Sequence, residues 1–173
     1  MTDPRIDDHF TRHLGDGTVA EQLGGVAIWR HERPEFVSFA THGLADKPIT
    51  AIYPQELVCS VQPGQDGAAL FLLRTTLELI LRGNRGLVNN QVIPNGEPLL
   101  ARTSITGILV SSHPYLEDTF EAVFDTDRRV VAEIMTLIPL TDHEVTQANT
   151  AGVDSLIDHL ESADPPLLDV TRP

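Results

Sequence analysis

Apolar residues follow two periods along the chain, one typical of strands and one typical of helices. Residues 26–30, 36–41 and 56–61 are short apolar runs or alternations bounded by Gly, Pro or polar turn residues, which predicts three strands. Residues 66–82 repeat apolar side chains at three- and four-residue steps, opposite Arg74, Glu78 and Arg82. This pattern predicts an amphipathic helix with a wide sheet-packing face. Residues 5–14 predict a shorter helix of the same kind.

The second half of the chain predicts three more strands and two short helices. Residues 105–110 and 119–124 are strand candidates, the latter with Phe120, Ala122 and Phe124 on one face. Residues 129–138 are apolar on both faces, which indicates a central strand. Residues 87–98 carry an Asn-Gly turn flanked by prolines, which favours a loop or an irregular hairpin. Helices are expected over 141–150 and from Val153 onward, with a break at Gly152.

The junction between the last strand and the first of these helices is the strongest local signal. Pro139 lacks an N–H group and is expected to end the strand. Thr141 and Glu144 stand at capping-box spacing, and Leu140 and Val145 can form a hydrophobic staple. The order α-βββ-α-loop-βββ-α predicts an α+β fold over residues 1–173. We expect a single-domain sandwich in which helices pack on a mostly antiparallel mixed sheet.

Acidic residues outnumber basic residues, and the excess is concentrated in the second half of the chain. Lys and Arg total 12 against 25 Asp and Glu, a net charge of −13, and residues 101–173 alone carry 13 acids and four bases. This charge disfavours nucleic acids and anionic membranes, because phosphate binding needs clustered cations. It favours a basic protein partner, although acidity can also serve only to keep a domain soluble.

The compartment is inferred from the termini and the cysteine count. No apolar run approaches the roughly 20 residues that cross a bilayer. The first eight residues are acidic and lack an apolar segment, so they do not resemble a signal peptide. Cys59 is the single cysteine, so no internal disulfide can form. We therefore expect a cytoplasmic protein.

Few residue patterns indicate chemistry. His9 and His13 have the spacing of metal ligands on one helical turn, but no further ligand accompanies them, so we expect no metal site. Cys59 alternates inward with Leu57 and Val61, which indicates core packing rather than a nucleophile. Motifs of nucleotide-binding loops, zinc proteases and serine hydrolases are absent from the sequence. We predict a protein without enzymatic activity and without a cofactor.

Four short motifs stand in a fixed order along the chain. They are Thr41-His42-Gly43-Leu44 at the end of a strand, Glu56-Leu57-Val58, the hydrophobic-Pro-x-Thr-x-x-Glu segment from Leu137 to Glu144, and Asp169-Val170-Thr171-Arg172 after the Gly152 break. Together they resemble the suppressor-of-fused domain family, over residues 20–173. The resemblance implies an α+β sandwich without catalytic residues.

The family resemblance implies a role in binding other proteins. In animals the family includes a two-domain negative regulator of Hedgehog signalling that binds a transcription-factor peptide as an added strand. From the sequence we expect no second domain after Pro173, and therefore no clamp between two domains. Bacterial one-domain members look like immunity proteins of polymorphic toxin systems, which neutralise a toxin by binding it.

An immunity protein, or another protein-binding module, is therefore the first hypothesis. An acidic surface would steer it toward a basic toxin such as a nuclease. The predicted contact residues are exposed acids on the last helix and beside the late hairpin: Asp154, Asp158 and Glu161, and Glu117, Asp118 and Glu121. Strand addition to an exposed sheet edge is a second possible mode of binding.

Two other functions stay open at this point. One is a small-molecule-binding or regulatory domain with a pocket under residues 87–98, which would need a concave apolar cavity with convergent polar groups. The other is an enzyme of unrecognised type that uses His42, His113 or Cys59.

Overall fold

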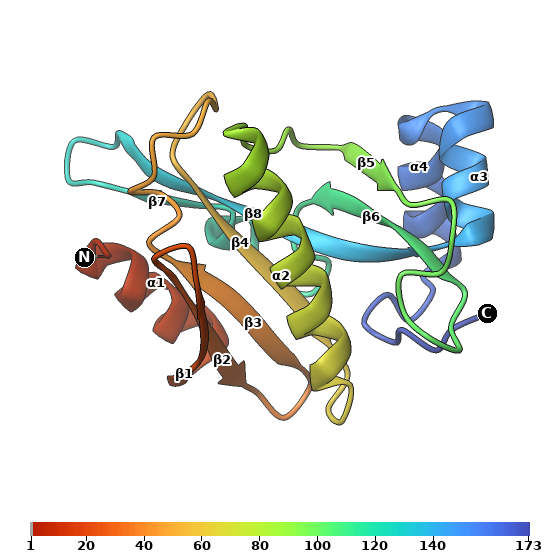
Figure 1. Cartoon of the computed structure of the whole chain (residues 1–173), viewed down its shortest axis with the longest axis horizontal. Helices are drawn as coiled ribbons and strands as arrows, with labels where there is room; N and C mark the ends of the chain where they lie inside the picture. Colours follow the sequence, from red (N-terminus) through yellow and green to blue (C-terminus); the bar gives the residue numbers. More distant parts are fainter. Residues whose placement is uncertain (1) are drawn as a thin grey trace.

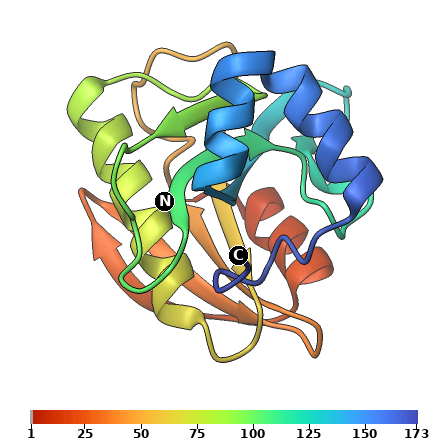
Figure 2. The same cartoon turned by 90° about the vertical axis from the view of Figure 1, so that its right-hand side faces the viewer.

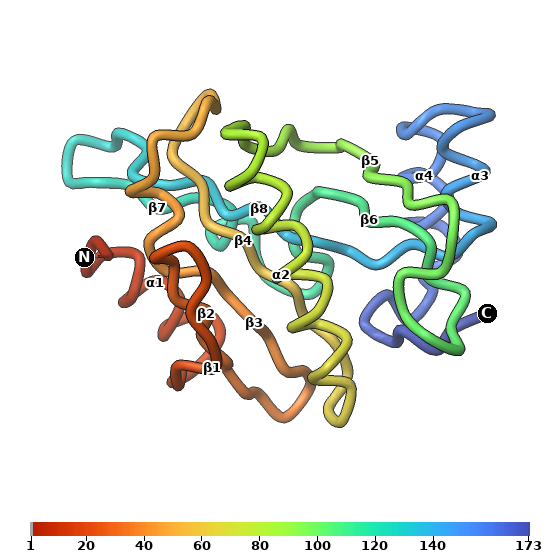
Figure 3. The backbone as a smooth tube through the Cα atoms, viewed as in Figure 1, coloured from red at the N-terminus to blue at the C-terminus, as the bar shows by residue number. Residues whose placement is uncertain are grey.

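The computed structural model of the protein describes residues 2–173. In chain order the elements are α1 (Pro4–Leu14), β1 (Gly17–Leu23), β2 (Val26–Glu32), β3 (Val37–His42), β4 (Gln55–Val61), α2 (Asp66–Gly83), β5 (Gln91–Pro94), β6 (Ile105–Ser111), the 3-10 turn η1 (Asp118–Phe120), β7 (Ala122–Phe124), β8 (Val130–Thr141), α3 (Asp142–Ala151) and α4 (Val153–Ala163). Figure 1 shows α1 and the α3–α4 pair at opposite ends of the longest axis, and Figure 3 traces the chain between them.

The strands form one sheet in the order β1-β2-β3-β4-β8-β6-β5, and β7 pairs with β8 beside this path. Every pair is antiparallel except β4 and β8, which run parallel with Gln55 opposite Glu133. The predicted α+β class with a mostly antiparallel mixed sheet is therefore confirmed. The parallel pair in the middle joins an antiparallel set formed by the first half of the chain to another formed by the second half.

Helices cover both faces of the sheet, as Figure 2 shows for α1 and α2. Side chains alternate along β8, so Met135 and Leu137 enter the buried cluster under α2. Ile134 points the other way, into the cluster under α1. Ile138 is on the same face as Ile134 and packs in the cluster of α3 and α4. Helices α1 and α4 therefore flank neighbouring parts of one face, and α2 covers the other.

Pro139 does not end the last strand, contrary to the prediction, because β8 continues to Thr141. Pro139 lies opposite Ile108 of β6, and its carbonyl accepts a hydrogen bond from Arg172, which is not part of the sheet. In an antiparallel pair the N–H and C=O of one residue point the same way, so the missing N–H also faces away from β6. Strand β4 pairs with β8 only as far as Thr136, so no ladder needs that N–H.

Two other segments differ from the sequence pattern, and a third, residues 87–98, agrees with the expected loop or irregular hairpin. Residues 119–124 divide into η1 and β7, so Phe120 is buried whereas Phe124 is 55% exposed, and the two do not share a face. The edge strand β1 has no corresponding prediction, because its largely exposed residues lack an apolar alternation. Residues 87–98 contain β5, a short edge strand that ends at Pro94.

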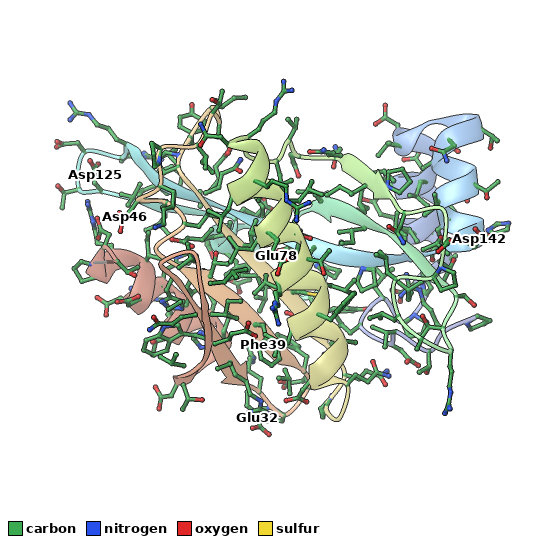
Figure 4. All side chains as sticks on the ribbon, viewed as in Figure 1. Glu32, Phe39, Asp46, Glu78, Asp125 and Asp142 are labelled. Atoms are coloured by element: carbon green, nitrogen blue, oxygen red, sulfur yellow. The ribbon has the colours of Figure 1, made fainter. Side chains whose placement is uncertain are left out.

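The long β8 has an acidic residue just beyond each end. Figure 4 shows Asp125, in the turn before β8, and Asp142, at the start of α3, far apart at opposite sides of the molecule.

Among residues 2–173, no helix combines the length and the hydropathy that a bilayer crossing requires.

Candidate functional site

The first two of the four motifs meet around one buried carboxylate. Glu56 is fully buried and accepts hydrogen bonds from the Thr41 hydroxyl at 2.6 Å and from the amides of Gly43, Ala45 and Leu44 at 2.9, 3.1 and 3.2 Å. The φ of +102° at Gly43 allows these three consecutive amides to converge. Burial raises the pKa of Glu56 to about 7, against the opposing effect of the hydrogen bonds.

The other two motifs meet around a second buried carboxylate. Thr141 and Glu144 form the predicted capping box, in which the Thr141 amide donates to Glu144 Oε2 at 2.7 Å. Arg172, from the C-terminal tail, donates to the same oxygen at 2.8 Å. It also donates to the carbonyls of Pro139 and Leu167. The predicted staple residues, Leu140 and Val145, lie in the same buried cluster.

These two centres have a structural role. Glu56 and Glu144 are both buried, and each accepts hydrogen bonds from at least one backbone amide and from one side chain. The first centre fixes the turn after β3, and the second ties the C-terminal tail to the junction of β8 and α3. The motifs that identify the family thus hold the fold together, and a binding surface has to be sought elsewhere.

Three buried histidines fasten α1 and its end to neighbouring elements. His42 Nδ1 donates to Asp7 Oδ1 at 2.7 Å, His31 Nδ1 donates to the Gly15 carbonyl at 2.8 Å, and His9 Nε2 donates to the Phe120 carbonyl at 2.9 Å. Burial is the main cause that lowers the pKa of all three rings. No set of three or more potential metal ligands lies together within residues 2–173, and His9 is already bonded.

Ser60 and His113 are adjacent, but their hydrogen bonds have the wrong polarity for nucleophilic catalysis. The Tyr115 amide donates to His113 Nδ1 at 3.2 Å, so this nitrogen carries the lone pair. His113 Nε2 therefore carries the proton and donates to Ser60 Oγ at 2.9 Å, and the Ser60 hydroxyl in turn bonds Ser38 at 2.6 Å. Burial lowers the pKa of His113 to about 3. The ring does not offer a base to Ser60.

Cys59 also lacks the surroundings of a nucleophile. Its side chain is fully buried beside Leu57 and Val61, and burial raises the pKa of its thiol to about 12. His42, the other residue considered for catalysis, is bonded to Asp7 and stacked on Trp29. The loop over residues 87–98 contributes Asn89 to a hollow of only about 60 Å³, which is small for an organic ligand.

Three hollows of about 850, 400 and 300 Å³ share Tyr115 as a lining residue, on the face of the sheet that α1 and α4 flank. The first, the α1 hollow, lies between α1 and β7; the second includes Phe36 and Leu168; the third, the α4 hollow, includes Ile157 and Leu160. The Tyr115 side chain is 47% exposed in the middle. We name the three hollows together the Tyr115 groove.

The two ends of the Tyr115 groove differ in charge. The α1 hollow is lined by Arg5, Arg12 and Arg33 together with Asp8 and Glu117, and Arg5 and Arg33 are paired with Asp3 at 2.6 Å and Glu35 at 3.5 Å. The α4 hollow is lined by two acids and by no Lys or Arg. A concave, partly apolar surface with an exposed aromatic residue at its centre is typical of sites that bind protein segments.

The structure brings two of the six predicted contact residues to this groove. Glu117 lines the α1 hollow and Glu161 lines the α4 hollow. The others are Asp154 and Asp158, exposed on α4, Asp118, exposed in η1, and Glu121, half-buried beside the 60 Å³ hollow. Within the described chain, none of the six carboxylates forms an ion pair or a side-chain hydrogen bond. Their role in binding stays a prediction.

Sequence reasoning missed three residues that shape the groove: Tyr115, Phe124 and Asp164. Phe124 is exposed on the α1 hollow, although alternation from Phe120 placed it inward. Tyr115 follows a proline in an irregular segment, where no periodicity predicts which way a side chain points. Asp164 ends α4 in a left-handed conformation, and the acidic run around it was the only available signal.

Comparison with known proteins gives a consistent result. The family model described as "Suppressor of fused protein (SUFU)" matches residues 20–173. No curated protein matches the sequence at a significant level. The crystal structure of a SUFU homologue from Neisseria gonorrhoeae is similar with a TM-score of 0.73 and 15% identity, over 99% of this chain and 95% of that chain.

Two further structures share the fold at low identity. One is that of the Sufu–Fu complex, with a TM-score of 0.70 and 13% identity over 98% of this chain and 90% of that chain. The other is Drosophila Suppressor of Fused, with a TM-score of 0.65 and 13% identity over 98% of this chain but only 49% of that chain. The family model covers most of the sequence, and the two buried glutamate centres join the motifs of that family. The chain belongs to the suppressor of fused family.

Proposed function

We propose that this chain is a protein-binding domain that works as an immunity protein in the cytoplasm. It neutralises a cognate toxin by direct binding and carries no catalytic activity of its own. The single observation that carries the proposal is the Tyr115 groove, which is flanked by carboxylates without ion-pair partners in the described chain. Unpaired exposed acids lose little on meeting a cation, and they accelerate association with a basic partner.

The exposed acids define how the toxin would approach. Asp154, Asp158 and Glu161 project from α4, and Glu117 and Asp118 from the segment around η1. Both groups border the face that α1 and α4 flank. A basic toxin domain would contact this face, and its own active site would be covered as a consequence.

The test is co-expression with the toxin encoded in the adjacent reading frame. We expect restored growth and a complex whose affinity falls as salt concentration rises. In calorimetry, the Glu117→Gln/Glu161→Gln variant should bind about twofold to tenfold more weakly, the effect of two exposed ion pairs. The matched control is Glu97→Gln/Asp127→Asn, which removes two exposed acids elsewhere. Absence of both rescue and complex would refute the proposal.

A regulatory domain of the suppressor-of-fused type is the second candidate. Strand β1 is an edge of the sheet, its Val19 is 54% exposed, and a bulge interrupts its pairing at Ala20. A partner segment could add to this edge as a further strand. The related chain in the Sufu–Fu complex also has a protein partner. Val19→Lys, which guards the edge with a charge, would abolish this mode and leave binding at the Tyr115 groove unchanged.

A further inference from the structure

We propose that the α4 hollow is a receptor for one arginine or lysine side chain, presented by an extended segment of the partner. This inference rests on the proposed function and deepens it, because it names the chemistry of the bound residue. The hollow has about 300 Å³, which is enough for one long side chain, and it shares Tyr115 with the neighbouring hollow.

The α4 hollow has apolar walls on the side of α4 and the sheet, and Ser111, Ser112 and His113 also line it. Leu109 and Ile138 of the sheet form its floor, and Leu160 and Leu167 are buried beside it in the α3–α4 cluster. Ile157 is partly buried on the same side. Walls of this kind bury the methylene stem of a long side chain and thereby gain hydrophobic free energy.

The rim of the hollow is acidic and has no cation of its own. Glu161 and Asp164 line it, and neither forms an ion pair within residues 2–173. The sequence has no Lys or Arg between Val130 and Thr171, and Arg172 is buried against Glu144. A purely apolar side chain would therefore cover two carboxylates without compensating their charge, which costs free energy. A cationic head at the end of an apolar stem satisfies both parts of the hollow.

Tyr115 sets the direction of the bound segment. Its half-exposed ring borders the α4 hollow and also the two neighbouring hollows. An aromatic face attracts a guanidinium, and an aromatic ring in the middle of a groove offers a surface for the adjoining residues of a peptide. The α1 hollow at the far end combines three arginines with two acids, Asp8 and Glu117, whereas the α4 hollow has two acids and no Lys or Arg. The cationic residue of the partner is thereby assigned to the α4 end.

The first experiment needs no partner. Butylguanidinium reproduces an arginine side chain, and n-butanol is its uncharged control. We expect saturable NMR shifts at Ile157, Leu160 and Tyr115 with butylguanidinium only. The Glu161→Gln/Asp164→Asn variant should raise the Kd about threefold to tenfold. Asn tolerates the left-handed conformation of residue 164, so this variant is expected to fold. Glu97→Gln/Asp127→Asn should leave the Kd unchanged.

Two results would overturn the inference. One is an equal response to butylguanidinium and n-butanol, and the other is an unchanged Kd in the Glu161→Gln/Asp164→Asn variant. A panel of displayed peptides extends the test: peptides selected on the protein should share an Arg or Lys, and the double variant should lose them. A selection without such a residue would also contradict the proposal.

The outcome is separable from that of the immunity function. If butylguanidinium binds as expected and toxin rescue fails, the receptor hollow stands and the immunity proposal falls. If rescue succeeds and butylguanidinium does not bind, the toxin is bound without an inserted cation, and the assignment of the α4 hollow is wrong.

Discussion

Arg172→Met is the sharpest test of the second glutamate centre. Methionine keeps much of the side-chain volume but removes the charge and every hydrogen-bond donor. The variant leaves the buried carboxylate of Glu144, whose side chain is 9% exposed, without its cationic partner. The carbonyls of Pro139 and Leu167 also lose this hydrogen-bond donor. Removing one partner of a buried ion pair typically costs about 3 to 5 kcal/mol. Whole domains of this size are stable by about 5 to 15 kcal/mol, so the loss should be large.

The assay is urea unfolding followed by circular dichroism, supported by thermal unfolding, in which we expect a fall in Tm of roughly 10 °C. Glu144→Met/Arg172→Met should be more stable than the sum of the single variants implies, because no buried charge remains unpaired. Arg129→Met, at an exposed position, should change stability by less than about 0.5 kcal/mol. A loss below about 1 kcal/mol for Arg172→Met, or strictly additive single effects, would refute the reasoning.

Two further predictions concern pH. Because the pKa of Glu56 is raised to about 7 from 4.5, the folded state holds its proton more tightly than the unfolded state. The stability that this proton uptake contributes is complete below pH 4.5 and is lost as the pH rises through 7, by up to about 3 kcal/mol. Between pH 5 and pH 8 the urea midpoint of the wild type should therefore fall relative to that of Glu56→Gln. His42 behaves in the opposite sense, because burial lowers its pKa below 6.5, and its Nε2 has no partner within residues 2–173. The contribution of His42 to the free energy of unfolding is therefore lost as the pH falls below 6.5. Trp29, the single tryptophan, stacks on this ring at 4.7 Å, and its fluorescence should change over that range in the wild type and much less in His42→Gln.

Short-range features of this fold could be predicted from the sequence, and features that depend on distant partners could not. The capping box of Thr141 and Glu144 spans three residues, so its geometry follows from local spacing alone. The role of Glu56 depends on amides beyond β3, and the role of Glu144 is completed by Arg172, far along the chain. Pro139 is a further case of dependence on distant partners, because whether a proline ends a strand depends on which neighbouring strand its missing N–H would face.

The acidic composition predicted some residues of the candidate binding surface but not its shape. The acidic excess led to the prediction that Glu117 and Glu161 are contact residues, and in the fold both line the Tyr115 groove. Composition did not indicate that the other end of the groove is lined with arginines, because these come from α1 and from the turn after β2. A groove is made by the packing of separate elements, so its shape and its charge pattern exist only after folding.

The parallel pairing of β4 with β8 has a consequence for synthesis on the ribosome. The strands β1 to β4 and helix α2 are made before β8, so the outer edge of β4 has no neighbour until β8 has been made. An unpaired, apolar strand edge invites association with other chains. The nascent protein therefore passes through a vulnerable half-sheet, and its closure waits for a contact between segments far apart in sequence, which is an intrinsically slow step. Arg172 follows α4 in the chain, so the ion pair that ties this segment to Glu144 can form only after β8, α3 and α4 have been made.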